Sequence, residues 1–159
     1  METGIGTISR FYTSLKALNP EGMNSCYGED IIFSDPVFGV LRGEEVRAMW
    51  EMLCARAREY SFSFFTPEDK GDGYYTCNWQ ATYLFSKTGK LVTNKGKAFM
   101  KLEDGLIIEH SDAFSLRRWI HQAFGIKGYL FGGFGFFQKR IRLEAQASLE
   151  KWISGKKKD

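Results

Sequence analysis

The segment His110-Ser111-Asp112 contains the first side chains that could take part in catalysis. Alternate residues of a β-strand point to one face, so His110 and Asp112 would share a face with apolar Ile108 and Phe114. A histidine beside a carboxylate among apolar neighbours can act as an acid, a base or an orienting pair. The alternative is that this pair is solvent-exposed, or that it anchors the two arginines at the start of the next helix.

Asp35 is the second candidate, because it follows the apolar run 31–33 and precedes Pro36. A carboxylate at a strand end that faces an apolar cavity loses hydration. Its pKa therefore rises, and it can move a proton on a carbon next to a carbonyl. We predict that Asp35, His110 and Asp112 form one catalytic group. In the alternative interpretation, Asp35 is a structural turn residue before the proline, or an N-cap partner.

Aromatic residues make up 16% of the chain, which leaves room for an aromatic-lined cavity beyond a minimal core. Trp79 and Tyr83 share one face of a predicted strand, and Trp50 lies on the apolar side of a predicted helix. We predict that these three residues, together with Tyr12, contact a ligand. The alternative is that all four belong to the hydrophobic core.

The elements that would position these side chains are helices first and strands afterwards. Residues 7–18 have apolar side chains at helical spacing, Asn19-Pro20 begins a short second helix, and Gly43 opens a third. Runs rich in β-branched and aromatic residues follow, separated by glycine-containing turns, at 60–65, 74–86, 91–102 and 106–114. This order predicts an α+β fold, in which a cone-shaped, curved antiparallel sheet wraps around the N-terminal helices.

A helical extension is predicted over residues 116–153, ending in a basic, disordered tail at 154–159. Within it, residues 125–135 form a glycine-rich aromatic loop that lacks the spacing of a phosphate-binding loop. That loop could be a lid over the cavity, a dimer contact, a membrane-facing surface or a packed connector. The last helix is predicted over 136–153.

Composition limits the function classes. The chain has 159 residues and a formal net charge of +3, with several of the lysines in the last nine residues, so no nucleic-acid groove is expected. The cysteines, Cys26, Cys54 and Cys77, have no metal-binding spacing and suit a reducing compartment. We expect neither a metal nor a cofactor. No signal peptide or membrane span is apparent, so we predict a cytoplasmic protein and expect no membrane contact.

One segment carries a family resemblance, and its order is Tyr27-x-x-Asp30-Ile31-Ile32-Phe33-Ser34-Asp35-Pro36-Val37-Phe38-Gly39, then Arg42-Gly43 before a helix. With the order of elements over residues 7–115, it resembles the nuclear-transport-factor-2-like (NTF2-like, cystatin-like) superfamily. The resemblance is to its SnoaL-like and ketosteroid-isomerase-like branch. It implies a single domain over residues 1–159, with a core at 7–115 and a homodimer formed through the exposed face of the sheet.

The resemblance also implies roles for individual residues. Asp35 lies where the ketosteroid isomerases keep their general base, and Asp112 is similar in placement to an acid/base aspartate of the SnoaL-type cyclases. The two hydrogen-bond donors of the isomerases fall on Phe11 and Ala98, which cannot donate, and Tyr12 is one residue away. In a helix, one residue turns a side chain by about 100°.

Three functions follow as hypotheses. The first is an apolar pocket for a small hydrophobic, carbonyl-bearing molecule with cofactor-independent proton transfer of the isomerase or cyclase type. The others are a non-catalytic ligand carrier and a homodimeric interaction module. The resemblance also extends to epoxide hydrolases of this fold, which need an arginine and two aspartates around a water. Here Arg42 and Arg47 are available, but the turn explains Arg42 better, and an exposed helix face explains Arg47 better.

Overall fold

The computed structural model describes residues 2–131 and 135–158. These residues form six helices and seven strands, in the order α1 (Gly4–Lys16), α2 (Pro20–Asn24), β1 (Tyr27–Asp35), β2 (Gly39–Arg42), α3 (Glu44–Arg56), β3 (Ser61–Phe64), β4 (Glu68–Gly71), β5 (Tyr74–Phe85), β6 (Lys90–Glu103), β7 (Leu106–Ala113), α4 (Leu116–Phe124), α5 (Ile126–Phe131) and α6 (Gly135–Lys156). The predicted α+β class is confirmed, and β2 and β4 are strands that the sequence patterns did not predict.

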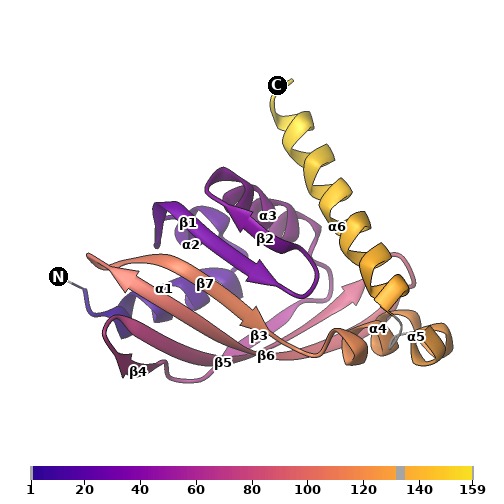
Figure 1. Ribbon diagram of the computed structural model, residues 1–159, viewed down its shortest axis with the longest axis horizontal. Coiled ribbons are helices and arrows are strands. Elements are labelled where there is room, and N and C mark those ends of the chain that lie inside the picture. The colour runs from indigo at the N-terminus through magenta and orange to yellow at the C-terminus, as the bar shows by residue number, and fades with distance from the viewer. Residues whose placement is uncertain (1, 132–134, 159) are drawn as a thin grey trace.

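The sheet has the order β2-β1-β7-β6-β5-β3, with β4 paired to β5. It is curved, and α1, α2 and α3 lie along one of its faces (Figure 1). The meander from β5 to β7 is antiparallel as predicted. However, β1 pairs with β7 in parallel, so the sheet is mixed. This pairing brings the N-terminal part of the chain beside the last strand, and it decides where the candidate site forms.

A β-bulge changes the alternation of β7. The partner of Lys101 is Glu109 and the partner of Leu102 is Ile107, so Ile108 is the extra residue. The structure consequently buries Ile107 in the core, where strict alternation had predicted Ile108. Beyond the bulge the pattern resumes, and both His110 and Asp112 are buried.

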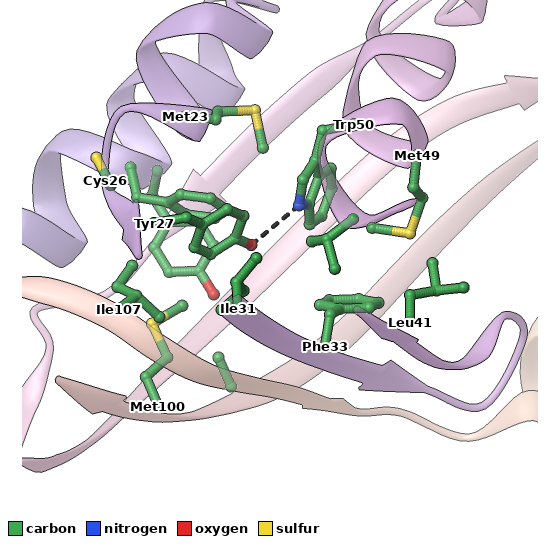
Figure 2. Close-up of a cluster of buried hydrophobic side chains, with 14 of the residues drawn as sticks. Met23, Cys26, Tyr27, Ile31, Phe33, Leu41, Met49, Trp50, Met100 and Ile107 are labelled. Atoms are coloured by element: carbon green, nitrogen blue, oxygen red, sulfur yellow. Dashed lines mark hydrogen bonds between the residues drawn. The ribbon is translucent and has the colours of Figure 1, made fainter. Parts of the chain in front are cut away.

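Helices α1 and α2 begin at side-chain caps, whereas α3 begins after Gly43, which has no side chain to cap it. Thr3 accepts a hydrogen bond from Gly6 N at the start of α1, and Asn19 accepts one from Gly22 N at the start of α2. In Figure 2, the Trp50 side chain extends from α3 toward Tyr27 at the start of β1, and other apolar side chains fill the space around them. Burial of each large apolar side chain contributes ~1.5–3 kcal/mol.

The C-terminal extension is more helical than predicted. The segment 126–131 forms α5 instead of a loop, and Gly128 lets it pack closely, since a Cβ there would lie 2.2 Å from Ile120 O. The rest of the predicted loop, residues 132–134, lies outside the described residues. Helix α6 continues to Lys156, into the predicted disordered tail, where that lysine pairs with Glu51 on α3.

The extension packs against the rest of the chain at two places. Leu149 joins the main core, and Ile141 joins a second cluster with Trp119 and Val92. Figure 1 shows α6 leaving the α4–α5 end of the molecule. Among the described helices, none combines the length and the apolar character needed to cross a bilayer.

Candidate active site

An apolar cavity of about 380 Å³ lies between the helices and the inner face of the sheet. Residues of the C-terminal extension also line it, among them Trp119, Phe124 and Ile141. Its volume is in the range of small-molecule sites, which is ~300–1,000 Å³. Six of the seven residues predicted for the site line this cavity, namely Tyr12, Asp35, Trp50, Trp79, Tyr83 and Asp112.

The two aspartates lie beside each other on neighbouring strands. Strands β1 and β7 are parallel, with Ser34 opposite Ser111, and the hydroxyl of Ser34 donates to that of Ser111 at 3.0 Å. Asp35 and Asp112 each follow one residue later, so both point to the opposite face of the sheet, which is the cavity side. The cavity therefore has two neighbouring carboxylates in its wall.

Asp35 is held by the turn that follows it. Its Oδ1 accepts hydrogen bonds from Val37 N at 2.8 Å and Phe38 N at 2.6 Å. Burial raises the pKa of Asp35 to about 6, and the negative charge of Asp112 adds to this shift, whereas the two backbone bonds oppose it. The turn role and the cavity role are thus compatible, because the turn fixes a carboxylate that also lines the cavity.

Asp112 is held by two side-chain donors. Its Oδ1 accepts from Trp79 Nε1 at 3.1 Å and lies 3.0 Å from His110 Nε2. The Trp79 ring reaches this position across Gly96 on β6, where an added Cβ would lie 2.3 Å from the ring. Gly96 was not identified from the sequence, since its role depends on the pairing of β5 with β6.

His110 lies behind the cavity wall rather than in it. Its side chain is 1% exposed, and its Nδ1 lies 2.8 Å from the hydroxyl of Tyr27. That hydroxyl accepts from Trp50 Nε1 at 2.9 Å. The phenolic proton is therefore directed at Nδ1, and the proton of a neutral imidazole sits on Nε2 and is donated to Asp112. With this tautomer every group in the network has a partner.

The His110 network is enclosed by aromatic rings. The ring centroids of Phe11 and Phe33 lie 5.4 and 5.1 Å from that of His110, both in edge-on contacts. Tyr27 completes the network but was not predicted as a site residue. Its signal in the sequence was its place at the start of the family-like segment 27–39, and the parallel pairing of β1 with β7 is needed to interpret it.

Tyr12 points toward the cavity, while the preceding Phe11 contacts His110. The hydroxyl of Tyr12 is buried and has no hydrogen-bond partner among the described residues. Burial, and then the charge of Asp112, raise its pKa well above the usual range, so it stays a donor. The helical offset of one residue therefore puts Tyr12, rather than Phe11, at the cavity.

Other chemistries find less support in the described residues. No group of three or more histidine, cysteine, aspartate or glutamate side chains there is arranged to hold a metal ion. The Arg47 guanidinium, one of the two considered for epoxide hydrolysis, donates to the carbonyls of Gly28 and Glu29 at 2.8 and 3.2 Å. Neither Arg42 nor Arg47 is among the residues that line the cavity.

Comparison with known proteins agrees with this architecture. The SnoaL-like domain family matches residues 8–110, and no curated protein matches the chain. A Catenulispora acidiphila protein with a ketosteroid-isomerase-like fold, crystallised with trimethylamine, has a TM-score of 0.65 at 12% identity, covering 74% of this chain and 91% of its own. A candidate polyketide cyclase from Pseudomonas putida has a TM-score of 0.64 at 16% identity, with 77% and 98% covered.

A third structure, TerC crystallised with polyporic acid, has a TM-score of 0.59 at 14% identity and covers 70% of this chain and 90% of its own. At these identities, the three structures show that the fold is shared. The family match is independent of them and spans most of the chain, from α1 to the His110 position on β7. The chain therefore belongs to the SnoaL-like domain family, with an NTF2-like fold.

Proposed function

We propose that this protein binds a small hydrophobic ligand with a carbonyl group and moves a proton on the adjacent carbon, as a cofactor-independent isomerase or cyclase. The observation that supports it most is the pair Asp35 and Asp112, side by side in the wall of one apolar cavity. A buried carboxylate with a pKa of about 6 is a base suited to near-neutral pH, because both of its forms are accessible.

In this proposal Asp35 is the base. It takes a proton from the carbon next to the carbonyl, and the electron pair of the broken C–H bond moves to the carbonyl oxygen. A hydrogen bond from Tyr12 stabilises the enolate, since that buried hydroxyl has no other acceptor in the described structure. The proton then returns from Asp35 to the same or another carbon. This sequence needs no external reductant or oxidant.

Asp112 is the second carboxylate and His110 is its positioning residue. Because His110 lies behind the wall, it acts through Asp112, whose oxygen Oδ1 it holds from one side while Trp79 holds it from the other. Both of these bonds use Oδ1, which leaves Oδ2 to orient the ligand or to exchange a proton with it. We therefore assign Asp112 an acid or orienting role.

The relatives support a cavity for small organic molecules. Two proteins of the same fold were crystallised with trimethylamine and with polyporic acid. A third protein of this fold is a candidate polyketide cyclase. We extend only the ligand class to this chain, a small organic molecule, since the identities are low.

The test is exchange of carbon-bound hydrogen in D₂O, followed by NMR with 2-acetylnaphthalene as a probe ketone. The wild-type protein should speed exchange of the acetyl protons. Asp35→Asn keeps the turn acceptor and should lower the rate by a factor of ~10²–10⁴, the usual contribution of a general base. Equal rates for the variant and the wild type, or exchange no faster than in buffer, would contradict the proposal.

The second candidate is a non-catalytic ligand carrier. The buried Tyr12 hydroxyl favours it, since a ligand oxygen could complete that group without any reaction. A carrier would bind the probe ketone but would not exchange its protons. It would also be insensitive to Asp112→Asn.

We also propose that the protein forms a homodimer through the outer face of the sheet. Three large aromatic side chains are exposed on that face, with Phe65 at 67% and Tyr74 and Phe99 at 48% each. Exposed aromatic side chains are enriched in interfaces. Sedimentation that shows only monomer at micromolar concentration would contradict this dimer.

We propose a cytoplasmic location because the cysteines are not oxidised to disulfides. Cys26, Cys54 and Cys77 are all free and buried. Free thiols persist in a reducing compartment. Fractionation of cells that express the protein would test this location.

A further inference from the structure

Tyr83 is a second phenol in the cavity, and in the described part of the chain its hydroxyl proton also has no acceptor. The hydroxyl accepts a hydrogen bond from Trp119 Nε1 at 2.6 Å, and no acceptor for its own proton is present among the described residues. A phenol has one proton to donate besides the lone pairs that accept. Tyr83 therefore resembles Tyr12, because each hydroxyl has a proton for which the described residues provide no acceptor.

The two phenols lie toward opposite ends of the cavity. The ring of Tyr12 stacks on Phe62 at 5.5 Å, and Phe62 stacks on Trp79 at 6.3 Å, so Tyr12 belongs to the Trp79 end. Tyr83 is four residues further along β5 on the same face. At ~3.3 Å per residue, the backbones of Trp79 and Tyr83 are ~13 Å apart. Trp119, on α4, marks the Tyr83 end.

Each phenol also lies near a different carboxylate. After the effect of burial, the charge of Asp112 raises the pKa of Tyr12, whereas the charge of Asp35 raises that of Tyr83. The order along the cavity is thus a phenol, two adjacent carboxylates and a second phenol. The remaining wall is largely apolar, with Phe62, Phe85 and Phe114 among its side chains.

We propose that Tyr83 is a second ligand-binding donor and that the ligand is an elongated, apolar molecule with an oxygen acceptor at each end. Tyr12 binds one oxygen and Tyr83 the other, while the carboxylates face the carbon framework between them. This inference depends on the proposed function only in using the same cavity. It specifies the ligand class as a dicarbonyl or equivalent two-oxygen compound of about two or three fused rings.

Two probes separate one-ended from two-ended binding: 2-acetylnaphthalene carries one carbonyl, and 2,6-diacetylnaphthalene carries one at each end. Their affinities for the full chain are measured by calorimetry. The diketone should bind about threefold to tenfold more tightly, which is the usual effect of one added neutral hydrogen bond. In Tyr83→Phe this preference should disappear, while the affinity for the monoketone stays as in the wild type.

Tyr60→Phe is the matched control. Tyr60 also lines the cavity, but its hydroxyl already donates to Leu15 O at 2.9 Å, so no proton remains for a ligand. This variant should keep the diketone preference. The proposal is overturned if the wild type binds both ketones equally, or if Tyr83→Phe weakens both to the same extent. Failure of the wild type to bind the diketone at about 1 mM, a very weak affinity, would overturn it as well.

The same samples distinguish this inference from the proposed proton transfer. A diketone preference without hydrogen exchange in D₂O would support two-ended binding by a carrier and contradict the catalytic proposal. Exchange with equal affinity for both ketones would support catalysis and overturn the role of Tyr83.

Discussion

The buried polar groups on the two sides of the cavity wall differ in one respect. A chain of hydrogen bonds runs from Trp50, in the wall, through Tyr27 and His110 behind it to Asp112, and every group in this chain has a partner. On the cavity side, the hydroxyl of Tyr12 is buried without a partner among the described residues, and burial raises the pKa of Asp35. The first arrangement stabilises the fold, and the second sacrifices stability for groups that a ligand would complete.

Apart from the loss of the base in Asp35→Asn, the largest expected effect is the pH dependence of exchange. Asp35 must be ionised to act as a base, and its pKa is raised to about 6. The rate should therefore be constant above pH ~7 and fall tenfold per pH unit below pH ~6, which is close to 100-fold at pH 4. The measurement is the NMR exchange rate of the probe ketone from pH 4 to 8. A rate that does not change below pH 6 would remove Asp35 as the base.

A substitution behind the wall should be the most damaging to the fold. Tyr27→Phe removes the hydroxyl that accepts from Trp50 and donates to His110, so two buried groups lose their partner at once. We expect the free energy of unfolding to fall by ~1–3 kcal/mol, the cost of leaving buried polar groups unpaired. Urea denaturation measures it. An unchanged free energy of unfolding would show that the hydrogen bonds behind the wall stabilise the fold no more than the groups on the cavity side do.

A substitution at Asp35 should change the free energy of unfolding in the opposite direction. Its folded-state pKa is above the value of 3.8 for an exposed aspartate, so the fold disfavours the charged form. Between those two values the folded state binds more protons, and stability falls as the pH rises. Asp35→Asn removes the charge but keeps an acceptor for the turn. It should therefore raise the free energy of unfolding by ~1–3 kcal/mol at pH 7.5.

The control for this gain is the same pair of proteins at low pH. At pH 4 the carboxyl group is largely protonated in the folded wild type, so most of the gain from Asp35→Asn should vanish. A gain of equal size at both pH values would mean that it arises from packing rather than from charge.

Local patterns in the sequence predicted which residues form helices and strands better than they predicted how deeply each side chain is buried. Helical spacing, glycine turns and alternation predicted the three N-terminal helices and the β5–β7 meander, because these signals lie within one element. They could not show that β1 joins β7 in parallel, since that contact links residues far apart in the chain. The adjacency of Asp35 and Asp112, and the position of His110 behind them, both follow from this pairing.

Tyr12 shows the same limit at a single residue. The family resemblance in the sequence places one hydrogen-bond donor of the isomerases on Phe11. In a straight helix, the side chain of Tyr12 is turned by about 100° from that of Phe11. In the structure both residues are buried, because α1 is covered on two sides: Phe11 contacts His110, and Tyr12 stacks on Phe62. The apolar stripe of the helix indicated only that both are buried, whereas Tyr12, which we predicted to contact a ligand, is the one that lines the cavity.

The smallest expected effect is also the sharpest contrast with Tyr27. Tyr12→Phe makes the same chemical change at a similarly buried tyrosine, but here it removes a hydroxyl that has no partner among the described residues. Removal of an unsatisfied buried group should leave the free energy of unfolding unchanged or raise it by up to ~1 kcal/mol. Parallel urea titrations of the two variants test this. If Tyr12→Phe lost as much stability as Tyr27→Phe, an ordered water or another group would complete that hydroxyl in the free protein. The cavity would then lose its distinction from the network behind it.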